Sequence, residues 1–116
     1  MNNNSRTARR IIRERSAATR LTASLNRGRA LATHAIAAGV DAETAEGVAN
    51  GLRSVAKRLG VTPVKVTRTH HTIAGRANRL RVVKHYTAAQ VATLRAAYRP
   101  RKAEYKAAVE LMTLAA

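Results

Sequence analysis

Histidines and basic side chains lie close together between residues 65 and 84, where they could do two kinds of chemistry. His70 and His71 are adjacent, and a histidine can act as a general base near neutral pH. The segment has no acidic residue, and its basic side chains suit the binding of phosphate groups. The basic residues are Lys65, Arg68, Arg76, Arg79, Arg81 and Lys84. These residue types indicate either a nucleic-acid-binding surface or a site that cleaves RNA.

An RNA-cleaving site would use His70 or His71 as its general base. Arg81 or Lys84 would stabilise the phosphate charge, with assistance from Tyr86. The spacing of these residues is not specific for catalysis, and the chain has no Ser-His-Asp arrangement, paired carboxylates or glycine-rich phosphate loop. We therefore expect no enzyme and no catalytic residue, and we keep a small endoribonuclease-like RNA-binding protein as an alternative.

The four histidines do not have the spacing of a metal site. His70 and His71 would point to opposite faces of a strand, and His85 has no nearby carboxylate or thiolate to complete a ligand set. His34 lies among alanines, which is typical of a packed or surface histidine. We expect no metal and no cofactor.

The whole chain is strongly basic, with 22 Lys and Arg residues against six Asp and Glu residues and a formal net charge of +16. Like charges at this density repel one another in a compact state, and a polyanion such as nucleic acid would neutralise them. A GC-rich genome would explain the preference for Arg over Lys but not the shortage of acidic residues. We therefore predict nucleic acid as the partner, DNA in preference to RNA, with no small-molecule substrate.

Composition also limits which partners and which cellular location we expect for the protein. The chain has no Cys, Trp or Phe, and no apolar stretch approaches the length of a membrane span. A basic helix bound to a membrane surface would need Trp, Phe and Leu on its apolar face. We therefore expect no membrane partner, and a cytoplasmic protein that is nucleoid-associated if it binds DNA. The length fits one domain, which we place at residues 6–116 after a flexible tail of residues 1–5.

The first element that positions basic side chains is a predicted helix that begins at Thr7. Apolar or small residues recur at three- and four-residue steps, which places them on one face. They are Ile11, Ala18, Leu21, Leu25, Gly28, Ala32, Ala35 and Ile36. We expect Gly28 to kink or split this helix and Gly39 to end it. The opposite face carries the charge, and we predict that it binds nucleic acid through Arg6, Arg9, Arg10, Arg13 and Arg20.

A second helix is predicted from Asp41, a good N-cap residue, to Gly60 at its C-terminal end. Glu43 and Glu46 lie in the first turn, where acidic side chains complement the helix dipole. This structural role means that the three acidic residues do not indicate a catalytic or metal site.

The same helix has two faces with different expected roles. Gly47 and Gly51 are four residues apart, which indicates close approach of another helix. The exposed face, with Arg53 and Lys57, could read DNA if the helix and the following hairpin formed a winged-helix arrangement. Ala and Gly dilute the polar residues of that face, so the hairpin is the better reader.

The hydrophobic period changes after Val61, and two runs alternate as β-strands do, at residues 64–70 and 79–86. The residues between them supply Gly and Asn for a turn, so the pattern predicts a β-hairpin. A two-stranded ribbon fits the major groove of DNA and a basic tip fits the minor groove. We predict that this hairpin binds nucleic acid through Lys65, Arg68, His71, Arg76, Arg79, Arg81 and Lys84.

A last helix is predicted to begin at Thr87, which forms a capping box with Gln90, while Tyr86 and Val91 form a hydrophobic staple. One apolar stripe continues across Pro100, so the helix either kinks there or stops and restarts with its face preserved. The stripe contains Val91, Leu94, Tyr98, Tyr105, Val109 and Met112. Because the predicted core is thin, we expect this stripe to pair with a second copy in a homodimer.

The predicted fold class is α+β and mainly helical, with two N-terminal helices, one basic β-hairpin and a long C-terminal helix kinked or interrupted at Pro100. In its small size, basic charge and order of elements the chain resembles plasmid and phage regulators. We predict a sequence-specific or architectural DNA-binding protein that regulates transcription. The remaining alternative is a phage or plasmid protein that acts by binding another protein.

Overall fold

A computed structural model describes the backbone of residues 3–71 and 79–116, and the side chains of residues 4–68 and 81–116. The described part contains five helices and a small antiparallel sheet, so the α+β, mainly helical class is confirmed. In chain order the elements are α1 (Asn3–Arg27), β1 (Arg29–Ala30), α2 (Leu31–Ala37), α3 (Ala42–Leu59), β2 (Lys65–His71), β3 (Arg79–Tyr86), α4 (Ala88–Ala97) and α5 (Ala103–Ala115).

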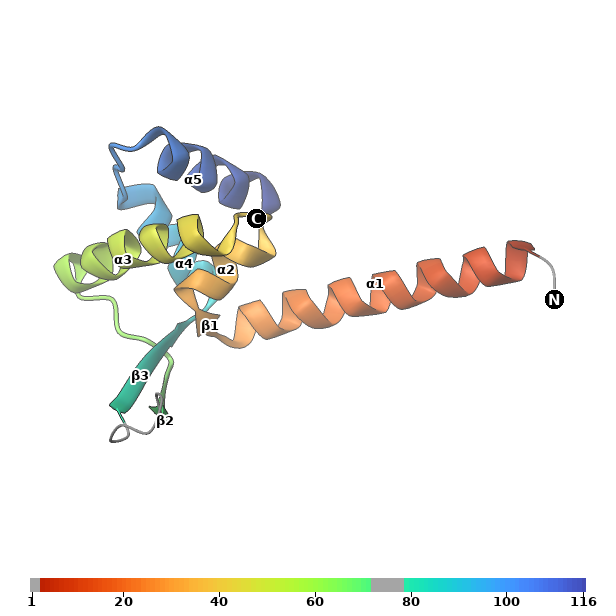
Figure 1. The fold of residues 1–116 in the computed structure, drawn as a ribbon, viewed down its shortest axis with the longest axis horizontal. Coiled ribbons are helices and arrows are strands. Elements are labelled where there is room, and N and C mark those ends of the chain that lie inside the picture. Colours follow the sequence, from red (N-terminus) through yellow and green to blue (C-terminus); the bar gives the residue numbers. More distant parts are fainter. Residues whose placement is uncertain (1–2, 72–78) are drawn as a thin grey trace.

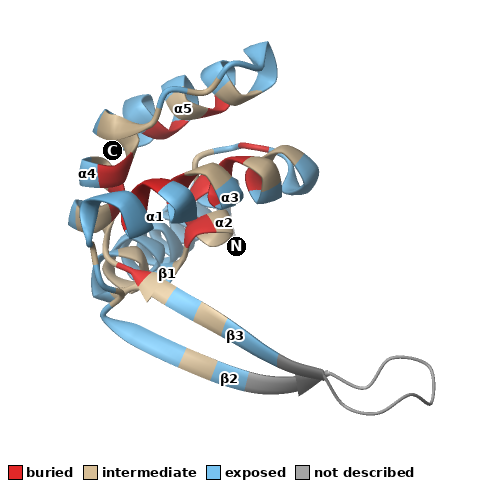
Figure 2. Cartoon of the chain, turned by 90° about the vertical axis from the view of Figure 1, so that its left-hand side faces the viewer, coloured by how far each residue is buried: buried red, intermediate tan, exposed pale blue. Residues whose placement is uncertain are grey.

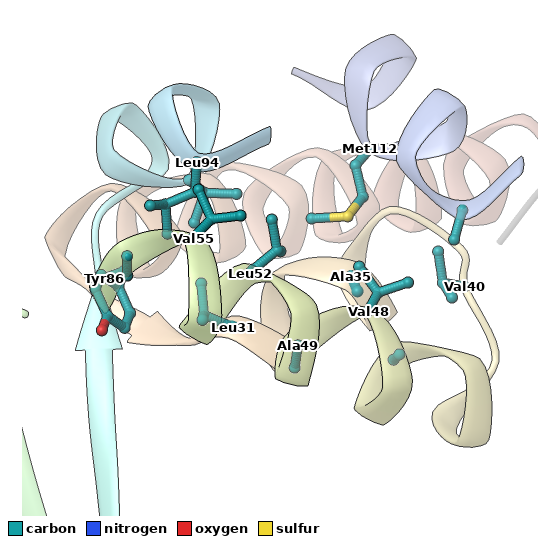
Figure 3. Packing of buried hydrophobic residues seen from close by; sticks show 14 residues of the cluster. Leu31, Ala35, Val40, Val48, Ala49, Leu52, Val55, Tyr86, Leu94 and Met112 are labelled. Carbon is teal, nitrogen blue, oxygen red and sulfur yellow. The ribbon is translucent and has the colours of Figure 1, made fainter. Parts of the chain in front are cut away.

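The body of the molecule is built around α3, which contacts α2, α4 and α5 (Figure 1). Leu31, Val48, Leu52 and Leu94 are its largest fully buried side chains, and Figure 3 shows them packed together with the smaller alanines and valines. Burial of these apolar surfaces drives the four helices together. Many of the buried residues are alanine or valine, so the core is thin, as the composition indicates.

The ends of α3 follow from local signals in the sequence. The Asp41 carboxylate accepts a hydrogen bond from the backbone N–H of Thr44 at 3.2 Å, which satisfies one free donor of the first turn. At the other end Gly60 adopts φ of 70°, a left-handed conformation that glycine takes without a steric penalty. Both predicted ends of this helix are therefore confirmed.

Gly47 and Gly51 lie under two tyrosine rings. A side-chain carbon placed on Gly47 would collide with the hydroxyl end of Tyr105 from α5. At Gly51 such a carbon would lie 2.5 Å from the ring of Tyr98, which follows α4. The predicted close approach is confirmed, and it allows both tyrosines to pack against the core.

The sheet contains three strands in the order β1-β3-β2, all antiparallel. The predicted hairpin is present, with Lys65 opposite His85 and His71 opposite Arg79. The short strand β1 was not predicted. It pairs Arg29 with Tyr86 and so covers the base of the outer edge of β3.

The first predicted helix is split at Gly28 into α1 and α2, which is one of the two outcomes expected at this glycine. Three helices therefore precede the hairpin, where the predicted fold counted two. Gly28 has φ of 126°, which a helix cannot accommodate and which favours glycine. Asn3, Asn4 and Ser5, which we assigned to a flexible tail, lie within the first turns of α1.

The C-terminal part contains two helices and not one long kinked helix. The capping box of Thr87 and Gln90 is present at the start of α4, as predicted. This helix ends at Ala97, and α5 begins at Ala103 beyond Pro100. The apolar stripe is preserved across the interruption, but it packs on the core of its own chain. It is therefore not available to pair with a second copy.

Two elements project from the body in different directions (Figure 1). The helix α1 runs along the longest dimension of the molecule, which is 54 Å, and residues 4–22 of this helix are exposed. The hairpin of β2 and β3 leaves the body on another side, and its described residues are largely exposed or intermediate (Figure 2). Within the described residues no helix is long and apolar enough to cross a membrane.

Candidate nucleic-acid interface

Six of the seven arginines of α1 form one stripe along the helix. At about 100° of rotation per residue they fall within an arc of about 100°. This arginine stripe consists of Arg6, Arg9, Arg10, Arg13, Arg20 and Arg27. Glu14 is the only acidic residue of α1, and its carboxylate lies 3.9 Å from Nε of Arg10. Both side chains are exposed, so this ion pair neutralises little of the charge.

The N-terminal part of the arginine stripe borders a shallow hollow of about 390 Å³. Its lining comes from α1 alone, through Arg6, Thr7, Arg9, Arg10 and Arg13. Guanidinium groups present planar sets of N–H donors that match the oxygens of phosphate. Several of them around one hollow form a surface suited to an anion.

The arginine stripe is turned away from α4 and α5. Four residues of α1 line a pocket together with Val91 of α4 and Met112 of α5, and at about 100° per residue their mean direction lies about 150° from the centre of the arginine stripe. They are Leu21, Thr22, Leu25 and Asn26. In Figure 1, α5 lies above the axis of α1 and the hairpin extends below it. The arginine stripe therefore borders the side of the molecule from which the hairpin projects.

The root of α1 is joined directly to the root of the hairpin. Ala30 pairs with His85 and Arg29 pairs with Tyr86, at the end of β3 nearest the body. Between α1 and β1, Gly28 lies so close to Val64 that a side-chain carbon on Gly28 would be 2.7 Å from Cγ2 of Val64. This packing and the strand pairing hold the two basic elements in a defined relation.

The hairpin carries basic side chains on both of its faces. The register places Lys65 and Arg81 on one face and Arg68 and Lys84 on the other, because side chains alternate along a strand. All four are exposed, and their side chains make no hydrogen bond or ion pair with another described residue. On the Lys65 face, Thr67 Oγ1 and His85 Nε2 lie 2.8 Å apart and share a hydrogen bond.

Three other predicted site residues are less fully described. His71 and Arg79 lie opposite each other at the end of the backbone ladder that is farthest from the body. Arg76 lies outside the described residues. The structure therefore places six of the seven predicted hairpin positions in the paired strands β2 and β3.

Several arginines of the body have a different role from those of the hairpin. The guanidinium of Arg58 donates to the carbonyl of Ala97 at 3.3 Å, and that of Arg99 donates to the carbonyl of Ala96 at 2.8 Å. These carbonyls belong to the last turn of α4, whose oxygens have no partner within the helix. Both side chains thus stabilise a helix end, a role that the cations of α1 and the hairpin do not have.

Apart from Glu14 of α1, the acidic residues lie outside the two basic elements. Asp41, Glu43 and Glu46 are at the start of α3, and Glu104 and Glu110 are on α5. The hydrogen bonds from Thr44 lower the pKa of Asp41, as expected for an N-cap carboxylate. Among the described residues no group of three metal-ligating side chains is present.

His34 has a structural position that the sequence did not predict in detail. It is 7% exposed, and its Nε2 lies 2.7 Å from the carbonyl oxygen of Tyr86 at the end of β3. Burial lowers the pKa of His34, partly offset by this hydrogen bond, so the imidazole is neutral and donates to the carbonyl. A single histidine among alanines was the only signal for this contact.

The structure disfavours two alternative sites, the RNA-cleaving site that includes Tyr86 and the exposed face of α3. Tyr86 is 3% exposed, so it is not available to assist RNA cleavage. On the exposed face of α3, Nη1 of Arg53 donates to Oδ1 of Asn50 at 2.6 Å, and Oγ of Ser54 donates to the carbonyl of Asn50 at 3.2 Å. This face is thus partly occupied by contacts within the helix.

No family model, no curated protein and no solved structure matches this chain.

Proposed function

We propose that the protein binds DNA, with the arginine stripe of α1 and the hairpin acting together as a sequence-specific or architectural reader. The observation that carries this proposal is that both elements are rooted at the β1-β3 pairing and that the arginine stripe borders the side from which the hairpin projects. Together they contain thirteen of the 22 Lys and Arg residues and one of the six acidic residues. Such a concentration of positive charge matches the phosphate backbone.

The dimensions of the two elements suit duplex DNA. From Arg6 to Arg27 the arginine stripe extends about 31 Å at 1.5 Å per residue, long enough to contact several phosphates. An α-helix or a two-stranded ribbon fits the B-form major groove, which is about 12 Å wide. The arginine stripe would contact phosphates, while hairpin side chains such as Arg68 and Arg81 would contact base edges.

DNA is preferred to RNA on the same grounds. The major groove of A-form RNA is too deep and narrow for side chains to read, and single-stranded RNA is bound largely by aromatic stacking. The three tyrosines of the chain are Tyr86, Tyr98 and Tyr105. Tyr86 is buried and the other two pack against the core, so they are poorly placed to stack on bases.

Two copies of the protein would act together in this proposal. A homodimer presents two sets of reading elements related by symmetry, and it would cover apolar surface that a thin core leaves exposed. A DNA-binding role would place the protein with the nucleoid and assign it to the regulation of transcription or to DNA architecture.

Fluorescence anisotropy with a labelled duplex of random sequence tests the proposal. A triple variant, R6Q/R13Q/R20Q, removes three charges of the arginine stripe. We expect it to weaken binding and to make the slope of log affinity against log salt shallower by about 2.7 units, at roughly 0.9 per phosphate contact. The helical circular dichroism signal should change little, because all three residues are exposed.

The matched control is R101Q/K102Q/K106Q, which removes three exposed charges near the start of α5. Its affinity should stay close to that of the parent protein. Equal losses for the two triple variants would mean that net charge alone attracts DNA, and the proposed interface would be wrong. Incubation with RNA at about pH 5 to 8, the range in which a histidine base titrates, should give no cleavage products.

A further inference from the structure

Among the described residues, α1 and α5 each carry an apolar surface with more than one large exposed side chain. One lies on the side of α1 away from the arginine stripe, where Ile11 and Ile12 are 39% and 63% exposed. The other lies on the outer side of α5, where Leu111 and Leu114 are 43% and 82% exposed. An isolated helix is only marginally stable in water, so the projecting part of α1 gains most from being covered.

The outer side of α5 combines leucines with acidic residues. At about 100° per residue, Leu111 and Leu114 lie about 80° and about 140° around α5 from the buried Ala108 and Met112, with exposed Glu104 next to Leu111 and exposed Glu110 next to Leu114. With two glutamates and one lysine, α5 is the only described helix with a net negative charge. Its outer side therefore favours a basic amphipathic helix.

A pocket adjoins this surface. It has a volume of about 310 Å³ and lies between the root of α1 and the end of α5, with Leu21, Leu25, Met112 and Ala115 among its lining residues. Leu111 lies one turn before Ala115 on the same side of α5. The name α5 groove is used here for this pocket together with the exposed Leu111 and Leu114 beside it.

The N-terminal half of α1 has the complementary chemistry. Ile11 and Ile12 project from the side of α1 away from the arginine stripe, and Arg15 lies between them one turn further on. Arg15 is the only arginine of α1 outside the stripe, so DNA contact does not account for it. These residues cannot reach the α5 groove of their own chain, because α1 is one continuous helix that points away from the body (Figure 1).

We propose that the N-terminal half of α1 from a second copy occupies the α5 groove, and that the exchange is reciprocal about a two-fold axis. Ile11 and Ile12 contact the groove leucines, and Arg15 faces Glu104 or Glu110 of the other copy. The arginine stripe stays on the outer side of each α1, where DNA would bind. This inference rests on the proposed pairing of two copies but not on DNA binding.

Cysteine cross-linking tests this arrangement, since the chain has no cysteine of its own. Nucleic acid is first removed with nuclease and a high-salt wash, and light scattering then gives the mass, for which we expect twice 12.5 kDa. The single variants I12C and L114C are mixed and treated with a short thiol cross-linker. We expect a covalent dimer from the mixture as the main product.

The matched control replaces L114C by L59C, because Leu59 is an exposed leucine at the far end of α3 and is 47% exposed. I12C mixed with L59C should give no such product. A dimer without the I12C to L114C cross-link would overturn the exchange while leaving the pairing of two copies intact. A monomeric mass would overturn both, and neither result depends on the DNA-binding measurements.

Charge reversal gives an independent readout. R15E should raise the Kd of the dimer about tenfold or more, because like charges then face each other across the contact. Combining R15E with E104R and E110R in one chain should restore dimerisation, whereas R15E with K106E should not. Failure of the first combination to restore the dimer would contradict the proposed contact.

Discussion

His34 ties α2 to the base of the hairpin through one buried hydrogen bond to Tyr86. The neutral imidazole suits this position, because a charge there would be removed from water and would lie near the Arg29 guanidinium. Tyr86 also pairs with Arg29 in β1. A single side chain thus supports the junction from which both basic elements extend.

The stability of the protein should therefore depend on pH through His34. Its pKa in the folded state is lowered below 6.5, so at pH values between the folded pKa and 6.5 the unfolded chain binds a proton that the folded protein does not. The contribution of His34 to the free energy of unfolding is full above pH 6.5 and is lost as the pH falls through the folded pKa. Urea unfolding at about pH 7.5 and about pH 5.5 measures the loss.

His34→Gln is the matched variant for this experiment, since glutamine can donate a hydrogen bond but does not titrate in this range. We expect it to be less stable than the parent protein at the higher pH and to lose less stability at the lower pH. The same pH dependence in both proteins would mean that other groups are responsible.

At the scale of elements, α3 depends on two positions that lack a side chain. Glycine in a helix costs about 1 kcal/mol relative to alanine, so Gly47 and Gly51 weaken α3 when it is considered alone. In the folded protein the tyrosine rings occupy the space that side chains would take. The lower helix propensity of the two glycines is offset because α5 and the end of α4 can then pack closely on α3.

Gly51→Ala should destabilise the protein in spite of the better helix propensity of alanine. The added methyl group would collide with the Tyr98 ring, and overpacking of this kind costs about 1 to 3 kcal/mol against a gain of about 1 kcal/mol. Thermal or urea unfolding measures the net change. In a Tyr98→Ala background the same substitution should stabilise the protein, and a loss of stability there would contradict the steric explanation.

The elements that the sequence predicted well are those with local signals. Asp41, Gly60 and the Thr87 capping box act within one helical turn, and they mark helix ends correctly. The strand β1 was missed because two residues have no period, and its pairing partner Tyr86 is distant in the chain. The C-terminal stripe was identified correctly, but its partner was wrong, since hydrophobic periodicity does not say which surface covers a face.

The candidate site could be predicted by residue type but not by arrangement. A run of basic residues without acids is visible in the sequence, and it marks both α1 and the hairpin. The side on which the arginine stripe lies depends on how Leu21 and Leu25 face the pocket beside α5. That relation arises from tertiary packing, which no local pattern contains.

At the scale of the whole molecule, the distribution of charge determines how binding responds to salt. With about six basic residues at phosphates, the slope of log affinity against log salt should be near −5, at roughly −0.9 for each contact. Affinity for a duplex of 30 base pairs should then fall about a thousandfold between 50 and 200 mM salt. Titrations at four salt concentrations give the slope.

A protein that acts by binding another protein would behave differently. Its affinity for that target would change much less with salt, because buried apolar contacts are weakly screened. A slope shallower than about −2 for the DNA duplex would contradict DNA binding by these two elements.

The pairing of β1 with β3 also imposes an order of events on the newly made chain. Arg29, which anchors the root of α1, finds its partner only when Tyr86 has been synthesised and has left the ribosome. Until then the arginine-rich N-terminal segment is covalently complete but has no fixed attachment to a folded body. During translation this cationic segment is close to ribosomal RNA and could bind it in any orientation. Completion of β3 is the step that fixes the orientation of α1 relative to the body.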